Sequence, residues 1–146
     1  MVKILIIHGP NLHLLGRRET DIYGDDTIET INDEVERLAK ERQTDVEFFQ
    51  SNHEGDIVDQ LGSADKLVDA VIINPAAYTH TSVAIRDAIK AINIPVIEVH
   101  LSNITEREEF RHTSLTAPVC MGQICGFGLM GYEMAFYALE NFLTKR

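Results

Sequence analysis

The stretch Ile4–Gly24, ILIIHGPNLHLLGRRETDIYG, decides the fold. It starts as an uninterrupted apolar run and breaks at the letters HGP. An apolar run without alternation is typical of a strand buried on both faces, as in a parallel sheet. The loop that follows carries the amide of Asn11, two guanidiniums and the phenol of Tyr23. Because open α/β proteins bind ligands at the carboxyl ends of their strands, this loop is a candidate wall of a site.

The rest of the chain alternates short apolar runs with helical patterns. Further strands are expected at 46–49, 70–73, 95–99 and 119–124, and helices at 28–43, from 57 to near Gly62, after Thr81 or Ser82, and near the C-terminus. Five such alternations predict an α/β fold with a doubly wound, five-stranded parallel sheet and helices on both faces. The expected strand order is 2-1-3-4-5, which is flavodoxin-like. We expect one domain over residues 1–146, a length that one core can serve.

Two finer predictions concern helix faces and one concerns a helix end. In the helix expected after Thr81 or Ser82, helical spacing predicts an inner face of Ala84, Ala88, Ala91 and Ile92. The same spacing predicts an inner face of Ala135, Ala138, Leu139 and Phe142 in the last helix. Thr105-x-x-Glu108 has the spacing of a capping box, which predicts the start of a short helix.

Composition excludes several classes of protein. The formal net charge of −10 argues against a nucleic-acid partner, which would require a basic patch. No apolar run approaches the roughly 18 residues that a membrane span needs, and the start lacks a signal-peptide pattern, so we expect no membrane partner and a cytoplasmic location. The sequence has no HExxH, clustered Cys/His spacing, P-loop or GxGxxG, so no metal or nucleotide cofactor is expected. The two cysteines, Cys120 and Cys125, are expected to be buried thiols without a disulfide.

Polar side chains follow three of the predicted strands at the point where each ends. They are Asn11, Asn74, His80, His100 and Ser102. The carboxyl ends of parallel strands meet at one edge of the sheet, so these groups are expected to converge on one pocket. An anionic ligand at that edge would need local positive charge to offset the net charge of the chain, and the candidates are Arg17, Arg18 and Arg111.

Two pairs of residues are candidates for acid–base chemistry at this edge of the sheet. Glu98 and His100 lie two residues apart on a predicted strand, so their side chains point the same way, and a carboxylate fixes the tautomer of an imidazole. Tyr23 is a poor base at a reference pKa of about 10, but a guanidinium such as Arg18 nearby would lower that pKa. The alternatives stay open at this point: a capped polar pair at a strand end, and a loop tyrosine packed on a helix.

Five longer segments carry a more specific pattern than any of the single motifs. They are GPNLHLLGRRETDIYG at 9–24, QSNHEGDIVDQL at 50–61, INPAAYTHTSVAIRDA at 73–88, VIEVHLSNITEREEFR at 96–111, and G-x-I-x-G-x-G-x-x-GY from Gly122 to Tyr132. Together these segments resemble those of the type II 3-dehydroquinate dehydratases (type II dehydroquinases). The resemblance covers essentially the whole chain. It implies a cofactor-free and metal-free lyase that dehydrates 3-dehydroquinate to 3-dehydroshikimate in the shikimate pathway of aromatic amino-acid biosynthesis.

The resemblance also implies a catalytic role for five residues. Tyr23 would remove the C2 proton of the substrate, and Arg18 would lower the pKa of that tyrosine. Asn11 would help to stabilise the enolate through an ordered water. His100 would protonate the departing hydroxyl group, and Glu98 would hold His100 in place. An enolate held by polar donors needs neither a lysine Schiff base nor a metal ion.

The remaining implications concern substrate binding and assembly. The substrate would be bound by Asn74, His80, Leu101, Ser102 and Arg111, under a lid formed by Arg17–Tyr23. Asp87 lies about two helical turns beyond His80, which is about 10 Å along a helix. The matching aspartate of the family reaches a neighbouring subunit in a trimer that builds into a homododecamer. Thr20 and His13 depart from the family pattern, which usually has proline at the first position and often asparagine or another polar residue at the second. The Thr20 change would leave the lid less stiff.

Two rival functions remain from the residues alone. A non-catalytic flavodoxin-like module would bind a small anion at the strand edge without changing it, or would act as a scaffold for an assembly. A hydrolase would use His100 as a base, although the sequence offers it no evident nucleophile. Formation of a conjugated enone from 3-dehydroquinate discriminates the dehydratase from both rivals.

Overall fold

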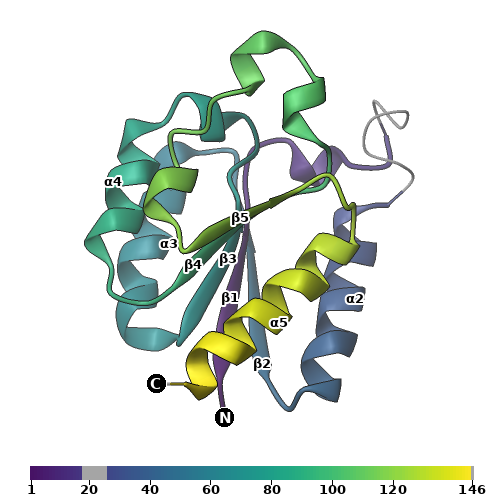
Figure 1. Cartoon of the computed structure of the whole chain (residues 1–146), viewed down its shortest axis with the longest axis vertical. Helices are drawn as coiled ribbons and strands as arrows, with labels where there is room; N and C mark the ends of the chain where they lie inside the picture. Colours follow the sequence, from purple (N-terminus) through teal and green to yellow (C-terminus); the bar gives the residue numbers. More distant parts are fainter. Residues whose placement is uncertain (18–25, 146) are drawn as a thin grey trace.

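The computed structural model describes residues 1–17 and 26–145, and within them it confirms the predicted fold class. Five parallel strands form a sheet in the order β2-β1-β3-β4-β5. The strands are β1 (Lys3–His8), β2 (Asp45–Gln50), β3 (Ala70–Asn74), β4 (Val96–His100) and β5 (Gly122–Cys125). The helices are α2 (Ile28–Glu41), α3 (Glu54–Leu67), α4 (Val83–Ala91) and α5 (Met130–Thr144). Figure 1 shows α2 and α5 on one face of the sheet and α3 and α4 on the other.

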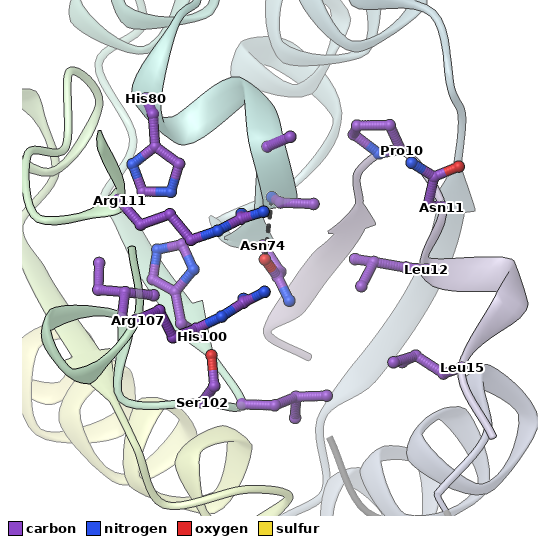
Figure 2. A pocket seen from close by; sticks show the side chains of 14 residues that line it. Pro10, Asn11, Leu12, Leu15, Asn74, His80, His100, Ser102, Arg107 and Arg111 are labelled. Carbon is purple, nitrogen blue, oxygen red and sulfur yellow. Dashed lines mark hydrogen bonds between the residues drawn. The ribbon is translucent and has the colours of Figure 1, made fainter. Parts of the chain in front are cut away.

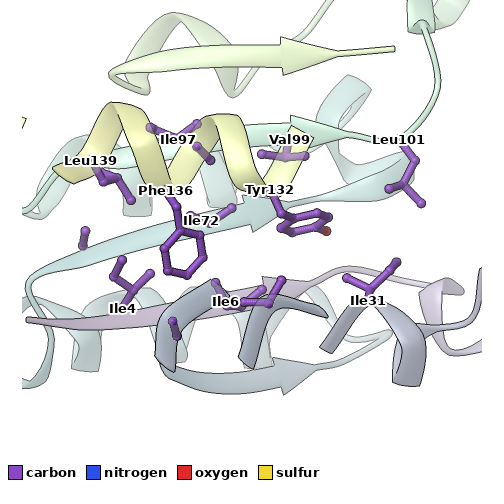
Figure 3. Packing of buried hydrophobic residues seen from close by; sticks show 14 of the residues in the cluster. Ile4, Ile6, Ile31, Ile72, Ile97, Val99, Leu101, Tyr132, Phe136 and Leu139 are labelled. Carbon is purple, nitrogen blue, oxygen red and sulfur yellow. The ribbon is translucent and has the colours of Figure 1, made fainter. Parts of the chain in front are cut away.

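The central strands are mostly apolar because both of their faces are covered. Side chains of a strand alternate between faces, so Ile4 and Ile6 of β1 join the cluster under α2 and α5, whereas Leu5 and Ile7 join the cluster under α3 and α4. In Figure 3, Tyr132, Phe136 and Leu139 of α5 point toward the sheet residues Ile4, Ile6 and Ile72. The two clusters hold the strands rigidly, and this fixes the positions of the residues that follow them.

Side-chain caps begin two of the helices where the sequence predicts polar caps. Thr27 accepts a hydrogen bond from the backbone N–H of Thr30, and the Thr30 side chain accepts one from the Thr27 N–H, so the two form a reciprocal capping box for α2. Ser82 is buried and caps α4 by accepting the Ile85 N–H at 2.9 Å. Such a cap satisfies a backbone donor that would otherwise lack an intrahelical partner.

Four sequence predictions about the helices are wrong in detail. Helix α3 continues past Gly62 to Leu67, because Ala64 extends the buried stripe of Ile57 and Leu61 while Gly62 lies on the exposed face. The inner face of α4 consists of Ile85 and Ile89.

The larger isoleucines take the central positions of α4, so the predicted alanine stripe lies to one side. Ala84 and Ala91 are exposed, and Ala88 and Ile92 pack at the margin of the cluster. The predicted capping box at Thr105 does not form, because the turn that begins at Ile104 is capped by Asn103, whose carboxamide oxygen accepts the Thr105 N–H at 3.3 Å.

The inner face of α5 is also shifted toward its N-terminus. Ala135 and Leu139 are buried as predicted, with Tyr132 and Phe136 beside them, whereas Phe142 is 41% exposed. The two cysteines are free and half-buried. No helix among the described residues is long and apolar enough to cross a membrane.

A backbone hydrogen bond joins the chain after β1 to the end of β3, where the two strands leave the sheet. The Gly9 N–H donates to the carbonyl oxygen of Asn74 at 2.8 Å. A Cβ atom on Gly9 would lie 2.6 Å from the carbonyl oxygen of Pro75, so only glycine fits without a backbone shift. Two non-glycine residues at these exits, Asn11 (φ 67°) and Ala76 (φ 53°), adopt left-handed backbone conformations. The two exit loops are thereby held close to each other above the sheet.

Candidate active site

A cavity of about 140 Å³ lies at the carboxyl edge of the sheet. It is bounded on one side by the segment after β1 and on the other by segments after β3 and β4 (Figure 2). The lining residues predicted from the sequence are Asn11, Asn74, His80, His100, Leu101, Ser102 and Arg111. The structure therefore brings together the polar groups that follow three separate strands, as the parallel topology requires.

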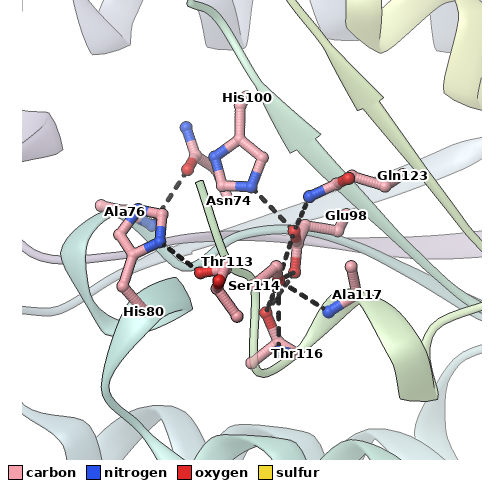
Figure 4. Close-up of polar contacts among 10 residues, drawn as sticks. All are labelled: Asn74, Ala76, His80, Glu98, His100, Thr113, Ser114, Thr116, Ala117 and Gln123. Atoms are coloured by element: carbon pink, nitrogen blue, oxygen red, sulfur yellow. Dashed lines mark hydrogen bonds and ion pairs between the residues drawn. The ribbon is translucent and has the colours of Figure 1, made fainter. Parts of the chain in front are cut away.

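A buried carboxylate–imidazole pair lies at the end of β4. Glu98 is fully buried and His100 is 5% exposed, and Nε2 of His100 lies 2.8 Å from Oε2 of Glu98. A carboxylate accepts, so Nε2 is the donor, and Nδ1 is the ring nitrogen on the side away from Glu98 (Figure 4). His100 also lines the cavity, so its ring connects a buried anion with the space where a ligand would bind.

Three further side chains donate to Glu98. Nε2 of Gln123 lies 2.6 Å from Oε2, Oγ of Ser114 lies 3.1 Å from Oε2, and the hydroxyl of Thr116 donates to Oε1. Burial by itself would raise the pKa of the Glu98 carboxyl group. The donors, with His100 the strongest, outweigh this effect and hold the pKa below its usual value. Glu98 is therefore a buried carboxylate at neutral pH.

The second histidine of the cavity is fixed in one tautomer. Nδ1 of His80 donates to the carbonyl oxygen of Thr113 at 2.8 Å. Burial is the largest effect and lowers the pKa of His80, while the bond to Thr113 opposes it. The Arg111 charge also lowers this pKa, and the Glu98 charge raises it. At neutral pH the ring is uncharged with its proton on Nδ1, so Nε2 remains as a hydrogen-bond acceptor.

The amide of Asn74 is held at the base of the cavity by its neighbours. Its Oδ1 accepts the backbone N–H of Ala76 at 3.0 Å, and the buried phenol of Tyr132 lies close to its side chain. Burial raises the pKa of Tyr132 well above its usual value, so this phenol stays neutral. An amide held in this way is preorganised to contact a polar ligand at a fixed point.

Two arginines make one wall of the cavity positive. Arg107 and Arg111 both line it, and their side chains are only 11% and 22% exposed. Nε of Arg111 also donates to Glu108 at 3.0 Å, and the bond to Arg111 lowers the pKa of that exposed carboxyl group. Sequence reasoning singled out Arg111 and missed Arg107, although their spacing of four residues was an available signal.

The structure does not place every predicted site residue at the cavity. Arg18 and Tyr23, together with Thr20, fall outside the described residues. Asp87 is exposed on α4 and does not line the cavity. Within residues 1–17 and 26–145, no group of three or more His, Cys, Asp or Glu side chains has the arrangement of a metal site.

The fold and the cavity together define a doubly wound α/β protein with a candidate acid–base site at the carboxyl edge of its sheet. The sequence profile of the family described as dehydroquinase class II matches residues 2–140. The chain belongs to this family.

Individual relatives agree with that assignment in sequence and in structure. The chain is 58% identical over 144 residues to a 3-dehydroquinate dehydratase of Caldicellulosiruptor bescii, and the match covers 98% of this chain and 99% of the relative. The crystal structure of a type II dehydroquinase from Butyrivibrio crossotus has a TM-score of 0.93 at 51% identity, over 95% of this chain and 97% of that one. A type II dehydroquinase from Propionibacterium acnes has a TM-score of 0.92 at 42% identity, over 95% and 96%.

Proposed function

We propose that this protein dehydrates 3-dehydroquinate to 3-dehydroshikimate, as a type II 3-dehydroquinate dehydratase. Membership of the family supports the activity. The observation that carries the proposal is the buried Glu98–His100 pair, which opens onto a cavity lined by amides, a hydroxyl, an imidazole and two guanidiniums. Such a cavity offers one site for an acid and several donors for an anionic, polyhydroxylated substrate.

The proposed reaction is an elimination through an enolate. The phenolate of Tyr23, stabilised by Arg18, takes the C2 proton next to the ketone, and the electrons of that C–H bond move onto the ketone oxygen. Asn11 stabilises the resulting enolate through an ordered water. The enolate then collapses to a conjugated enone as the hydroxyl group leaves, with Nδ1 of His100 supplying the proton that makes it water. Each group acts on charge that develops only during the reaction, which is how such groups accelerate a step.

The proposed binding roles follow the chemistry of each side chain. Arg111, supported by Arg107, attracts the substrate carboxylate and offsets the negative charge of the chain. His80 accepts a hydrogen bond from a substrate hydroxyl, because its Nε2 is a lone-pair acceptor. Asn74 binds a second hydroxyl group, and the Leu101–Ser102 segment contacts the carboxylate. The Arg17–Tyr23 segment is proposed to close over the ligand and exclude water.

The cellular setting is part of the same proposal. We place the reaction in the shikimate pathway, in the cytoplasm, and in a homododecamer built from trimers. The exposed position of Asp87 on α4 leaves it available to a neighbouring subunit, whose site it would complete. Light scattering coupled to gel filtration measures the assembly, and a monomeric or dimeric mass for fully active protein would contradict it.

Enone formation provides the direct test of the reaction. Purified protein mixed with 3-dehydroquinate should raise the ultraviolet absorbance as the conjugated product accumulates, at equal rates with and without a chelator. Absence of any rise in both conditions would refute the proposed activity.

Two substitutions test the assigned roles. Tyr23→Phe should abolish turnover and leave ligand binding largely intact, because only the phenolic oxygen is removed. Tyr137→Phe makes the same chemical change at an exposed position on α5 and serves as the control. Near-normal turnover in Tyr23→Phe would exclude that tyrosine as the base, whereas a loss in both variants would point to damage that is not specific to the site.

A further inference from the structure

The carboxylate of Glu98 has a full set of hydrogen-bond donors. His100, Gln123, Ser114 and Thr116 all donate to it (Figure 4), and an ionised carboxylate has about four lone-pair sites. Within the described part of the chain, no Lys or Arg side chain donates to this carboxylate. Three neutral donors therefore share the stabilisation of the buried charge with the His100 imidazole, which is the one partner of the four that can become cationic.

The backbone holds the Ser114 hydroxyl beside Glu98. Its oxygen accepts the backbone N–H of Ala117 at 2.8 Å and that of Thr116 at 3.2 Å. The same oxygen lies 3.1 Å from Oε2 of Glu98 and 3.2 Å from the Thr116 hydroxyl, so the two hydroxyl groups lie together beside the carboxylate. Gln123 is directed differently, since it pairs in register with Glu98 on the adjacent strand β5 and reaches across to it. The donors thus come from two parts of the chain, the loop that contains Ser114 and Thr116, and strand β5. Protonation of Glu98 would weaken the hydrogen bonds from both parts.

The position of one proton decides whether His100 is a strong acid. When the pair carries two protons, one is on Nδ1 of His100 and the other lies between Nε2 and Oε2 of Glu98. On Nε2 it makes an imidazolium, which readily releases the Nδ1 proton. On Oε2 it leaves a neutral imidazole, whose Nδ1 proton is far less acidic.

We propose that Thr116, Ser114 and Gln123 are positioning residues that keep this shared proton on His100. The inference rests on the proposed function, because His100 is there the acid that protonates the departing hydroxyl group. Each donor stabilises the carboxylate relative to the carboxylic acid, and thereby stabilises the arrangement in which the imidazole is charged. None of the three lines the cavity, so they act through Glu98 rather than on the substrate.

The electrostatics of the surroundings agree with this assignment. Burial alone would raise the pKa of Glu98, and the hydrogen bonds from His100, Thr116 and Gln123 reverse that effect. The other titratable groups that sense this carboxylate are His80, Cys120 and Cys125. Burial raises the pKa of the Cys120 thiol to about 12, and the Glu98 charge acts in the same direction. The thiols therefore stay neutral and do not compete for the proton.

Paired substitutions isolate the donors. Thr116→Val removes the donor with little change of shape, and Thr116→Ser retains it. Gln123→Met removes the amide donor from a residue that is exposed on the edge strand, so the core is unaffected and the test survives if Thr116→Val fails to fold. Thr44→Val is the matched control, because Thr44 is partly buried at the opposite edge of the sheet, where its hydroxyl donates to the Arg42 carbonyl.

Steady-state kinetics and nitrogen NMR of the His100 ring give two separate readouts. In Thr116→Val and Gln123→Met, kcat should fall about tenfold or more while KM changes by less than about twofold, because only the acid is weakened. At a pH where the pair is doubly protonated, the Nε2 resonance should move from the imidazolium position toward that of an unprotonated nitrogen. Thr116→Ser should restore both values toward wild type.

The outcomes separate this inference from the proposed function. A normal kcat in both donor-deleted variants would overturn it, and so would a lower kcat with an unchanged Nε2 resonance, which would indicate displacement of the ring instead. The NMR measurement needs no substrate. If wild-type protein fails to convert 3-dehydroquinate but the Nε2 resonance shifts as expected, the proposed function fails while the placement of the proton stands.

Discussion

Replacement of Gly9 by alanine should damage stability and activity together. Gly9 lies where β1 leaves the sheet, and an added Cβ would meet the Pro75 carbonyl oxygen at 2.6 Å and the Asn74 carbonyl oxygen at 2.9 Å. Both contacts are with backbone, so no side chain can rotate away. Ordinary van der Waals contact begins at 3.4 Å, so the two segments would have to separate by about 0.8 Å.

The separation has two energetic consequences. Overpacking of a well-packed site costs about 1–3 kcal/mol. A shift of about 0.8 Å would also stretch the 2.8 Å bond between the Gly9 N–H and the Asn74 carbonyl beyond hydrogen-bonding distance, which costs about 0.5–1.5 kcal/mol more. We therefore expect Gly9→Ala to lower the free energy of unfolding by about 2–4 kcal/mol. Enone formation should also fall, because Asn74 lines the cavity.

Urea denaturation at a fixed protein concentration measures the first effect, and Gly62→Ala supplies the control. Gly62 lies within α3 with nothing within 4 Å of its added Cβ, so alanine should stabilise that variant by about 0.4–1 kcal/mol. The two changes are chemically identical and opposite in expected sign. A Gly9→Ala protein as stable as wild type, or a Gly62→Ala protein destabilised to the same extent, would refute the reasoning.

Three further predictions address pH, binding and capping. Burial lowers the pKa of His8 below its ordinary value of about 6.5, so the stability that its neutral form contributes is present above that pH and is lost as the pH falls through the folded pKa. Denaturation should thus become easier between pH 7 and pH 5, less so in His8→Gln, and a flat profile in wild type would contradict this. Arg107→Met should raise KM for the anionic substrate about tenfold, with a smaller effect on kcat, and an unchanged KM would remove Arg107 from binding. Ser82→Ala should lower the free energy of unfolding by about 1 kcal/mol in urea melts, since the Ile85 N–H loses its cap, and no change would show that the cap contributes nothing.

The fold was predictable because local and global signals agree in this chain. Continuous apolar runs such as 4–7 and 70–73 can be satisfied only by strands covered on both faces, and the intervening lengths suit parallel crossovers. Helix details were less predictable. Taken alone, Gly62 predicts the end of a helix. Helix α3 nevertheless continues beyond it, because Ala64 is buried against the core. In α4 the choice between alanines and isoleucines for the inner face depends on how much space the sheet leaves.

The site was partly predictable for a similar reason. Residues directly after strands, such as Asn74 and His100, are placed by topology, so their convergence follows from strand order. Ser114 and Thr116 come from a loop, and their approach to Glu98 depends on a chain path that periodicity does not encode. Arg107 belongs to the same category, since it lies in the irregular segment after β4.

The left-handed backbone at Ala76 has a consequence for attempts to make this protein more heat-tolerant. Alanine at φ 53° is disfavoured relative to glycine, so Ala76→Gly offers an easy gain in melting temperature. Ala76 also donates the backbone N–H that orients Asn74, and glycine would keep this donor but on a backbone that is less restricted. A selection for thermal stability alone would therefore favour Ala76→Gly, although the substitution weakens the wall of the cavity. Screens for hardier variants should therefore score turnover and thermal endurance in the same round.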